Sequence, residues 1–212
     1  MPNTNPIIDN KEIVDEFNKR VKEVSLINVL PVGSVTIGQK GKELSDIKGM
    51  VEAGVVAISE DGKSVMNTAI YREGMIAAKE TKVPVFAHCE DKDLVGNGVI
   101  NEGEKAKELG LPGISNAVED IIAARDVFLA KDTGAKLHLC HCSTRDSVTI
   151  IKQAKAEGIS VTGEVCPHHF ILTDSDIPAD DANYKMNPPL RSKKDVEALI
   201  QGLKAARGPR TW

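Results

Sequence analysis

The chain has 212 residues, of which 41% are hydrophobic, and a formal net charge of −4 at pH 7. This length and apolar fraction suffice for a globular domain with a substantial core, while the scattered basic residues offer no surface for nucleic acid or an anionic membrane. No apolar run reaches the roughly 18 residues of a membrane helix, and the first residues lack the layout of a signal peptide. We therefore expect a cytoplasmic protein without nucleic-acid or membrane partners.

Helical and extended patterns alternate along the first half of the chain. Apolar residues at helical spacing predict helices at residues 9–24, 44–54 and 67–81. Short apolar runs rich in β-branched residues predict strands at residues 26–32, 55–59 and 83–88. We expect Gly54 to end the second helix and Thr68 to cap the third.

The second half continues the alternation after a glycine-rich loop. Helical patterns occur at residues 116–134, 145–158 and 194–204. Extended patterns occur at residues 136–142 and 159–165. Ser143 with Asp146 fits a capping box for the second of these helices, and Ser192 with Asp195 fits a cap for the third.

Five apolar strands separated by amphipathic helices predict an α/β fold whose parallel sheet is covered on both faces. Such a sheet is either doubly wound or closed into a (β/α)8 TIM barrel. Polar residues gather where the strands end, which is where both folds place ligands. No G-x-G-x-x-G or P-loop motif follows any strand, so the barrel is favoured over a nucleotide-binding sheet.

The segment HLCHCS at residues 138–143 concentrates two histidines and two cysteines. Side chains alternate along a strand, so these residues cannot all face one ion, and a structural zinc site is disfavoured. The one further short cluster is Cys166 with His168 and His169. Four cysteines in a chain of this length are too few for a disulfide framework, and we expect buried free thiols.

Three metal-competent side chains each end a different predicted strand: Asp61, His88 and His141. In a parallel barrel these strand ends meet at one rim, where carboxylate and imidazole groups suit zinc or a similar cation. The alternative for each residue is ordinary. An aspartate at a strand end also caps turns, and an isolated histidine is more often a satisfied polar residue than a ligand.

Several motifs in order resemble the bacterial dihydroorotases of the cyclic amidohydrolase group. They extend from residue 1 to about Lys204 and read MPNTNP, LPVGSVT, SEDG, FAHCED, HLCHCST, GEVCPHH and KMNPPLR. The resemblance implies a metal-dependent TIM barrel that interconverts dihydroorotate and N-carbamoyl-aspartate in pyrimidine synthesis. It also implies that Asp61 bridges two zinc ions in place of a carboxylated lysine, and that His88 and His141 bind the second zinc. Asn3 and Asn187 would contact the small-molecule substrate; without the resemblance both are turn formers beside proline.

Some elements of the resembled family do not occur in these residues. The sequence contains no His-x-His pair, and the family's proton-shuttling aspartate of the last strand lies beyond the match. We therefore expect an incomplete barrel over residues 1–204, which is inactive by itself and prone to self-association through uncovered apolar surface. Residues 205–212 (AARGPRTW) look foreign to the family. Two alternatives remain: a non-catalytic structural partner of aspartate transcarbamoylase, and a related cyclic amidohydrolase such as a hydantoinase.

Overall fold

The computed structural model describes residues 1–205, which divide into two compact units. The first unit comprises Met1–His88 and Phe128–His138, and the second comprises Cys89–Val127 and the chain from Leu139 onward. The expected tail at 205–212 lies outside the described residues, except that Ala205 ends a helix. Among the described helices, none combines the length and the apolar character that a membrane crossing requires.

Five short parallel strands form one sheet in the order β1-β2-β3-β6-β7. Their bounds are β1 (Val32–Ser34), β2 (Ala57–Ser59), β3 (Val85–Ala87), β6 (Leu137–Leu139) and β7 (Val161–Gly163). In the first unit Gly33 pairs with Ile58, and Ile58 pairs with Val85. The parallel sheet confirms the predicted α/β class and the five-stranded partial barrel.

The prediction of a strand at residues 26–32 is wrong for all but its last residue. Leu26, Ile27 and Leu30 are 101%, 77% and 68% exposed, and the strand begins only at Val32. High β propensity forms a strand only where a neighbouring strand and a packed face are available. The segment therefore leaves these three large apolar side chains in water.

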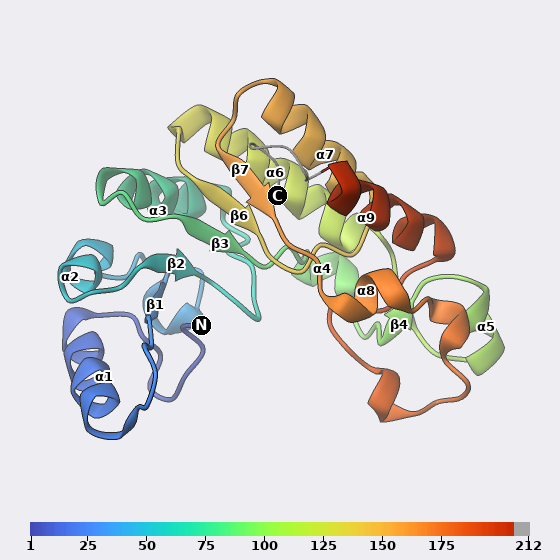
Figure 1. The fold of residues 1–212 in the computed structure, drawn as a ribbon, viewed down its shortest axis with the longest axis horizontal. Coiled ribbons are helices and arrows are strands. Elements are labelled where there is room, and N and C mark those ends of the chain that lie inside the picture. The colour runs from blue at the N-terminus through green and yellow to red at the C-terminus, as the bar shows by residue number, and fades with distance from the viewer. Residues whose placement is uncertain (206–212) are drawn as a thin grey trace. The chain divides into compact units, whose positions relative to one another are not determined.

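Three α-helices lie wholly in the first unit: α1 (Lys11–Val24), α2 (Ile47–Glu52) and α3 (Thr68–Glu80). A 3-10 turn, η1 (Ile37–Gln39), follows β1, and α2 packs against both α1 and α3 (Figure 1). The prediction of Thr68 as a cap is wrong by one residue, because the Asn67 side chain accepts from the backbone N–H groups of Ala69 and Ile70. A Cβ at Gly74 of α3 would lie 2.7 Å from Val35, so the helix can approach the β1 segment closely only with glycine there.

The region of the second unit expected to be a loop holds regular structure. It contains α4 (Lys92–Val95), α5 (Glu104–Leu109) and a two-stranded parallel sheet of β4 (Ile100–Asn101) and β5 (Gly113–Ile114). The elements are only two to six residues long, too short for periodicity to distinguish them from a loop. A small core of Ile100, Ala106, Ile177 and Leu190 holds them.

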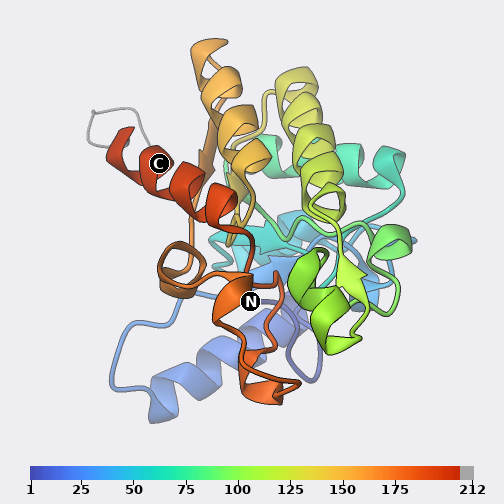
Figure 2. The ribbon, with the colours of Figure 1, turned by 90° about the vertical axis from the view of Figure 1, so that its right-hand side faces the viewer.

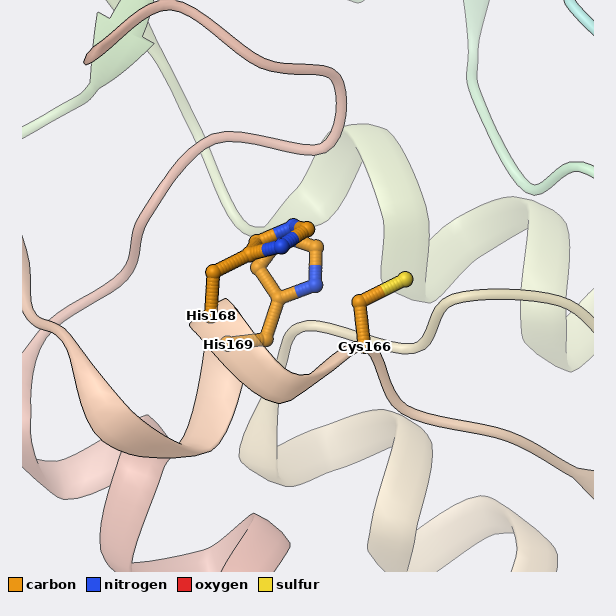
Figure 3. A group of neighbouring side chains, drawn as sticks. All are labelled: Cys166, His168 and His169. Carbon is orange, nitrogen blue, oxygen red and sulfur yellow. The ribbon is translucent and has the colours of Figure 1, made fainter.

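Four α-helices follow β5 in the described residues: α6 (Ala117–Thr133), α7 (Arg145–Ala156), α8 (Pro167–Ile171) and α9 (Lys193–Ala205). Two 3-10 turns, η2 (Asp174–Asp176) and η3 (Ala182–Tyr184), lie between α8 and α9. Within the second unit α9 packs against α7 and α8 (Figure 2). The short α8 carries His168 and His169, which follow Cys166 by two and three residues (Figure 3).

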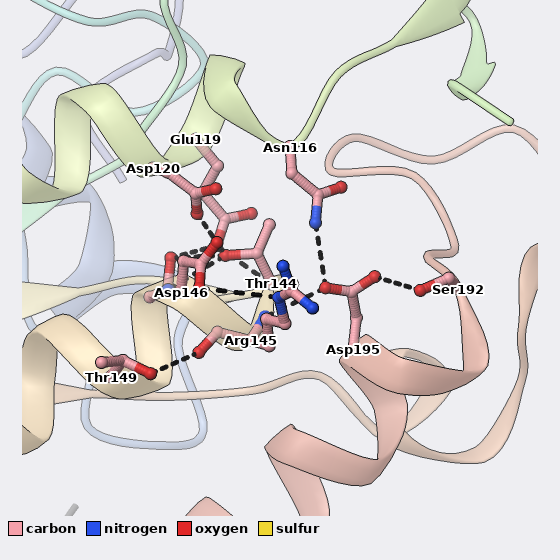
Figure 4. A network of polar contacts seen from close by, with 10 residues as sticks. Asn116, Glu119, Asp120, Thr144, Arg145, Asp146, Thr149, Ser192 and Asp195 are labelled. Carbon is pink, nitrogen blue, oxygen red and sulfur yellow. Dashed lines mark hydrogen bonds and ion pairs between the residues drawn. The ribbon is translucent and has the colours of Figure 1, made fainter.

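A buried carboxylate fixes the loop that joins β6 to α7. Glu119, which is 3% exposed, accepts from the backbone N–H groups of Ser143 at 2.9 Å and Thr144 at 3.3 Å, and from the Ser147 hydroxyl at 2.7 Å. Figure 4 shows Glu119 beside Thr144. The Ser143 hydroxyl also donates to Glu119. The capping box predicted at Ser143 is therefore wrong: the cap is Thr144, and the Ser143 hydroxyl is held by Glu119.

Glu60 plays the same part in the first unit. It is 4% exposed, and its Oε2 accepts from the backbone N–H groups of Val35 and Thr36, both at 3.1 Å. The Thr36 hydroxyl donates to the other carboxylate oxygen. A charged acceptor that lies among several donors at low exposure stabilises the fold strongly, because each hydrogen bond forms away from competing water.

We expect Glu119→Gln to lower the free energy of unfolding by about 3 kcal/mol, because one amide oxygen cannot replace two carboxylate oxygens that accept from several donors. Asp120→Asn on the same helix is the matched control. Burial raises the pKa of Asp120 to about 6, with a smaller opposing effect of the Thr144 hydroxyl.

A carboxyl group whose folded pKa is raised stabilises the protein only at low pH, and this contribution is lost as the pH rises through about 6. Asp120→Asn is therefore expected to unfold at the same or higher urea concentration than the wild type at pH 7.5. After allowance for solvent screening of this half-exposed group, the gain is up to about 1 kcal/mol. Equal losses for both variants at pH 7.5 would contradict the distinct role of Glu119.

Candidate functional site

Three of the predicted site residues come together in the first unit. Asp61 lies two residues after β2, and His88 directly follows β3. A carboxylate oxygen of Asp61 and a ring nitrogen of His88 lie within 4.8 Å of one another. The Asn3 amide donates to Asp61 Oδ2 at 3.4 Å. The predicted substrate residue Asn3 thus contacts Asp61, which lies close to His88 after the ends of neighbouring parallel strands.

The backbone around Asp61 is fixed by its neighbours. The Asp61 N–H donates to the Ser59 hydroxyl at 3.0 Å, and the Asp61 carbonyl accepts from the Gln39 side chain at 3.0 Å. Gln39 is 3% exposed and has φ of 52°, an unusual conformation for a residue other than glycine. Such strained positions gather at functional sites, where the surrounding structure enforces them. Sequence reasoning missed Gln39, and no local pattern identifies it.

A hydrogen bond to its main-chain carbonyl fixes the position of His88. Its carbonyl accepts from the buried Ser64 hydroxyl at 2.7 Å, and its side chain is 6% exposed. Because Asp61 and His88 supply carboxylate oxygen and imidazole nitrogen at short separation, this pair fits a divalent cation of the zinc type.

His141 lies in the second unit, in the turn that follows β6. The expected strand at 136–142 ends at Leu139, so His141 lies outside the strand that was expected to end beside it. Its direction is set instead by a backbone φ of 38°, and its N–H donates to Glu164 Oε1 at 3.4 Å. A left-handed conformation at a histidine is uncommon, and it marks a position where the loop geometry matters.

Asn187 lies in the second unit and is exposed. Its amide donates to a carboxylate oxygen of Glu90, which follows His88 by two residues in the HCED segment. Sequence reasoning missed Glu90 as the partner of Asn187. The placement of Glu90 two residues after a strand-end histidine was the available signal.

The prediction of free thiols is confirmed, whereas the prediction of burial fails for Cys166, which is half-buried. All four are reduced, and Cys89, Cys140 and Cys142 are buried. Burial raises the pKa of the Cys89 and Cys142 thiols well above the usual value, so both remain protonated and act as small apolar side chains.

Among the described residues, Cys166, His168 and His169 form a further group with the donor atoms of a metal site. Their ligand atoms all lie within 4.8 Å of one another, and all three belong to the second unit (Figure 3). Burial lowers the pKa of His169 to about 4 against the opposing effect of the Pro188 carbonyl, so this imidazole is neutral at pH 7.

The chain has close relatives among characterised sequences. A family model described as "Dihydro-orotase-like" matches residues 1–147. The chain is 48% identical over 203 residues to the dihydroorotase of Geobacillus sp. (strain WCH70), a match covering 96% of this chain and 48% of the relative. It is 47% identical over 203 residues to the dihydroorotase of Staphylococcus epidermidis (strain ATCC 12228 / FDA PCI 1200), with the same coverage of both chains. The chain spans about half the length of these relatives.

Solved structures with the same fold include hydantoinases. L-hydantoinase (dihydropyrimidinase) from Arthrobacter aurescens superposes with a TM-score of 0.78 at 21% identity, over 97% of this chain and 47% of that one. D-hydantoinase (dihydropyrimidinase) from Thermus sp. superposes with a TM-score of 0.68 at 22% identity, over 93% and 45%. At such identities the likeness concerns the fold. The sequence matches carry the assignment: the chain belongs to the dihydro-orotase-like family.

Proposed function

We propose that this chain is part of a cytoplasmic, zinc-dependent dihydroorotase, which reversibly cyclises N-carbamoyl-L-aspartate to dihydroorotate in pyrimidine biosynthesis. The observation that carries the proposal is the placement of Asn3 beside Asp61 and His88, at the ends of neighbouring parallel strands. Identity of 48% to a dihydroorotase over 96% of the chain supports it.

The proposed metal ligands are Asp61, His88 and His141. Their strands, β2, β3 and β6, are consecutive in the parallel sheet, and each of these residues follows the carboxyl end of its own strand. Asp61 offers two oxygens and is the proposed bridging ligand, while each histidine offers one nitrogen. Two such cations, when bound, supply hydroxide at neutral pH and polarise the amide carbonyl that is attacked.

Asn3 and Asn187 are the proposed substrate-binding residues. Their amide groups now donate to Asp61 and Glu90, respectively. A substrate carboxylate can accept these donors in place of the protein carboxylates, so binding exchanges hydrogen bonds and leaves neither amide without an acceptor. Such an exchange favours a ligand with carboxylate groups, as in N-carbamoyl-L-aspartate, over a neutral cyclic amide.

Two other functions are distinguished by specific observations. A hydantoinase has a related barrel, and the fold likeness to hydantoinases fits it; the placement of Asp61 where a hydantoinase carries a carboxylated lysine disfavours it. A non-catalytic partner of aspartate transcarbamoylase would have no need for a preserved carboxylate–imidazole pair, yet Asp61 and His88 retain one.

We expect Asp61→Ala and His141→Ala each to lower the zinc content of the purified chain, because each removes a proposed ligand. Asp93→Ala, which changes an exposed carboxylate in α4, is the control and should leave the zinc content unchanged. Zinc per chain is measured by atomic absorption after dialysis. Equal zinc in the wild type and both ligand variants would contradict this ligand set.

We expect N-carbamoyl-L-aspartate to raise the Tm of the chain above its value with zinc alone, because a ligand that binds only the folded state stabilises it. Asn3→Ala should remove this shift, whereas Asn183→Ala, at an exposed amide in η3, should preserve it. Turnover by these 212 residues alone is expected to be unmeasurable, since the sequence has no His-x-His pair. A larger Tm shift with hydantoin than with N-carbamoyl-L-aspartate would favour the hydantoinase alternative.

We also propose that the chain self-associates through the exposed loop residues Leu26, Ile27 and Leu30, whose large apolar side chains lie in water within five successive positions. Changing all three to Ser is expected to shift the sedimentation profile toward smaller species. Leu94→Ser, at a 53% exposed leucine of the second unit, is the matched control and should leave the profile unchanged. An unchanged profile for the triple variant would refute this surface.

A further inference from the structure

Helix α8 gathers three metal-competent side chains within four successive positions. Cys166 is the N-cap, Pro167 is the first helical residue, and His168 and His169 follow. Proline at the first helical position has a fixed φ suited to the helix, so the turn from Cys166 into α8 is rigid. The three side chains project to the same side of the segment (Figure 3). Their donor atoms lie within 4.8 Å of one another, so a small movement brings them around one cation.

A hydrogen bond of His169 determines which of its two ring nitrogens can bind a cation. Its Nε2 lies 2.9 Å from the Pro188 carbonyl oxygen, which can only accept, so the proton of the neutral ring lies on Nε2. Nδ1 therefore carries a lone pair. A histidine whose second nitrogen donates to a backbone carbonyl is the arrangement that orients imidazoles in metal sites.

The Nδ1 lone pair of His169 has no hydrogen-bond donor among the described residues, although the side chain is only 2% exposed. A buried acceptor without a donor destabilises the fold, because it has lost its hydrogen bonds to water and gained none in the protein. A cation on the Cys166 side of the ring would satisfy this nitrogen. This observation is independent of the spacing of the three residues, and it points to the same ligand.

We propose that Cys166, His168 and His169, here called the Cys-His cluster, form a binding site for a thiophilic divalent cation of the zinc type. One thiolate and two imidazoles select zinc over magnesium and calcium, which require oxygen ligands. Three protein ligands leave one position of a tetrahedral cation open to water or a small ligand. The cluster shares no residue with the proposed ligands Asp61, His88 and His141, and its ligand set differs from theirs by the sulfur.

The sulfur of Cys166 permits a test that does not respond to metal bound by Asp61, His88 and His141, because these residues offer only oxygen and nitrogen. Co²⁺ bound by a thiolate shows sulfur-to-metal charge-transfer absorption in the near ultraviolet, which oxygen and nitrogen ligands do not produce. Titration of the full chain with Co²⁺ is expected to produce this absorption. Cys166→Ser should abolish it. His169→Ala should weaken Co²⁺ binding by more than about tenfold, because even residues that only hydrogen bond to a ligand cost at least this much affinity when they are changed. Zinc should displace the cobalt.

Two controls separate the cluster from the rest of the chain. Cys140→Ser should preserve the absorption, because Cys140 is outside the cluster. Asp61→Ala should also preserve it, so failure of the dihydroorotase proposal would leave this result intact. Absorption that persists in Cys166→Ser, or that disappears in Asp61→Ala, would overturn the proposal.

A measurement on the unaltered chain covers the case in which the variants do not fold. Zinc is expected to slow alkylation of Cys166 by iodoacetamide at least tenfold, with the modified residue identified by peptide mass spectrometry. Magnesium at the same concentration should have no effect. Equal alkylation of Cys166 with and without zinc would show that no cation binds there.

Discussion

The arrangement of the strand-end loops depends on carboxylates that are buried among hydrogen-bond donors. Glu60 accepts from main-chain N–H groups after β1, and Glu119 accepts from those of the loop after β6. Short parallel strands leave many main-chain groups unpaired at their ends, and burial of these groups without acceptors would cost more than the strands contribute. A single charged side chain that satisfies several of them permits the loops to stay buried and ordered.

The proposed ligands take their positions from these loops. Asp61 directly follows Glu60 in sequence, so the residue that anchors the β1 loop also fixes the start of the turn that presents Asp61. His141 lies two residues before Ser143, whose N–H and hydroxyl both bind Glu119. Its φ of 38° is held by this anchored loop and not by a strand. The positions of the proposed ligands thus depend on the hydrogen bonds of neighbouring loop residues, because the ligands lie beyond the ends of their short strands.

The sequence was sufficient to locate four of the five strands of the larger sheet, since short apolar runs bounded by turns are typical of buried strands. It failed at residues 26–32, where the same β-rich composition has no neighbouring strand and faces water. It also failed at two caps. Asn67 caps α3 in place of Thr68, because the Asn67 side chain accepts from two N–H groups of the first turn. Thr144 caps α7 in place of Ser143, because the Ser143 hydroxyl donates to Glu119, which is distant in the sequence. The Glu119 contact joins residues far apart in the sequence, so a local sequence pattern does not reveal that the Ser143 hydroxyl is already bound.

The same limit explains which site residues could be predicted. Strand-end positions identified Asp61 and His88, and the structure joins them with Asn3 in one unit. For the Cys-His cluster the spacing was visible, but its ligand competence rests on the tautomer of His169, which the Pro188 carbonyl nineteen positions away determines. A histidine in a sequence therefore has no fixed chemistry until the partner of its second nitrogen is known. Where that partner is a carbonyl and the first nitrogen is buried without a donor, a cation is the ligand that completes the site.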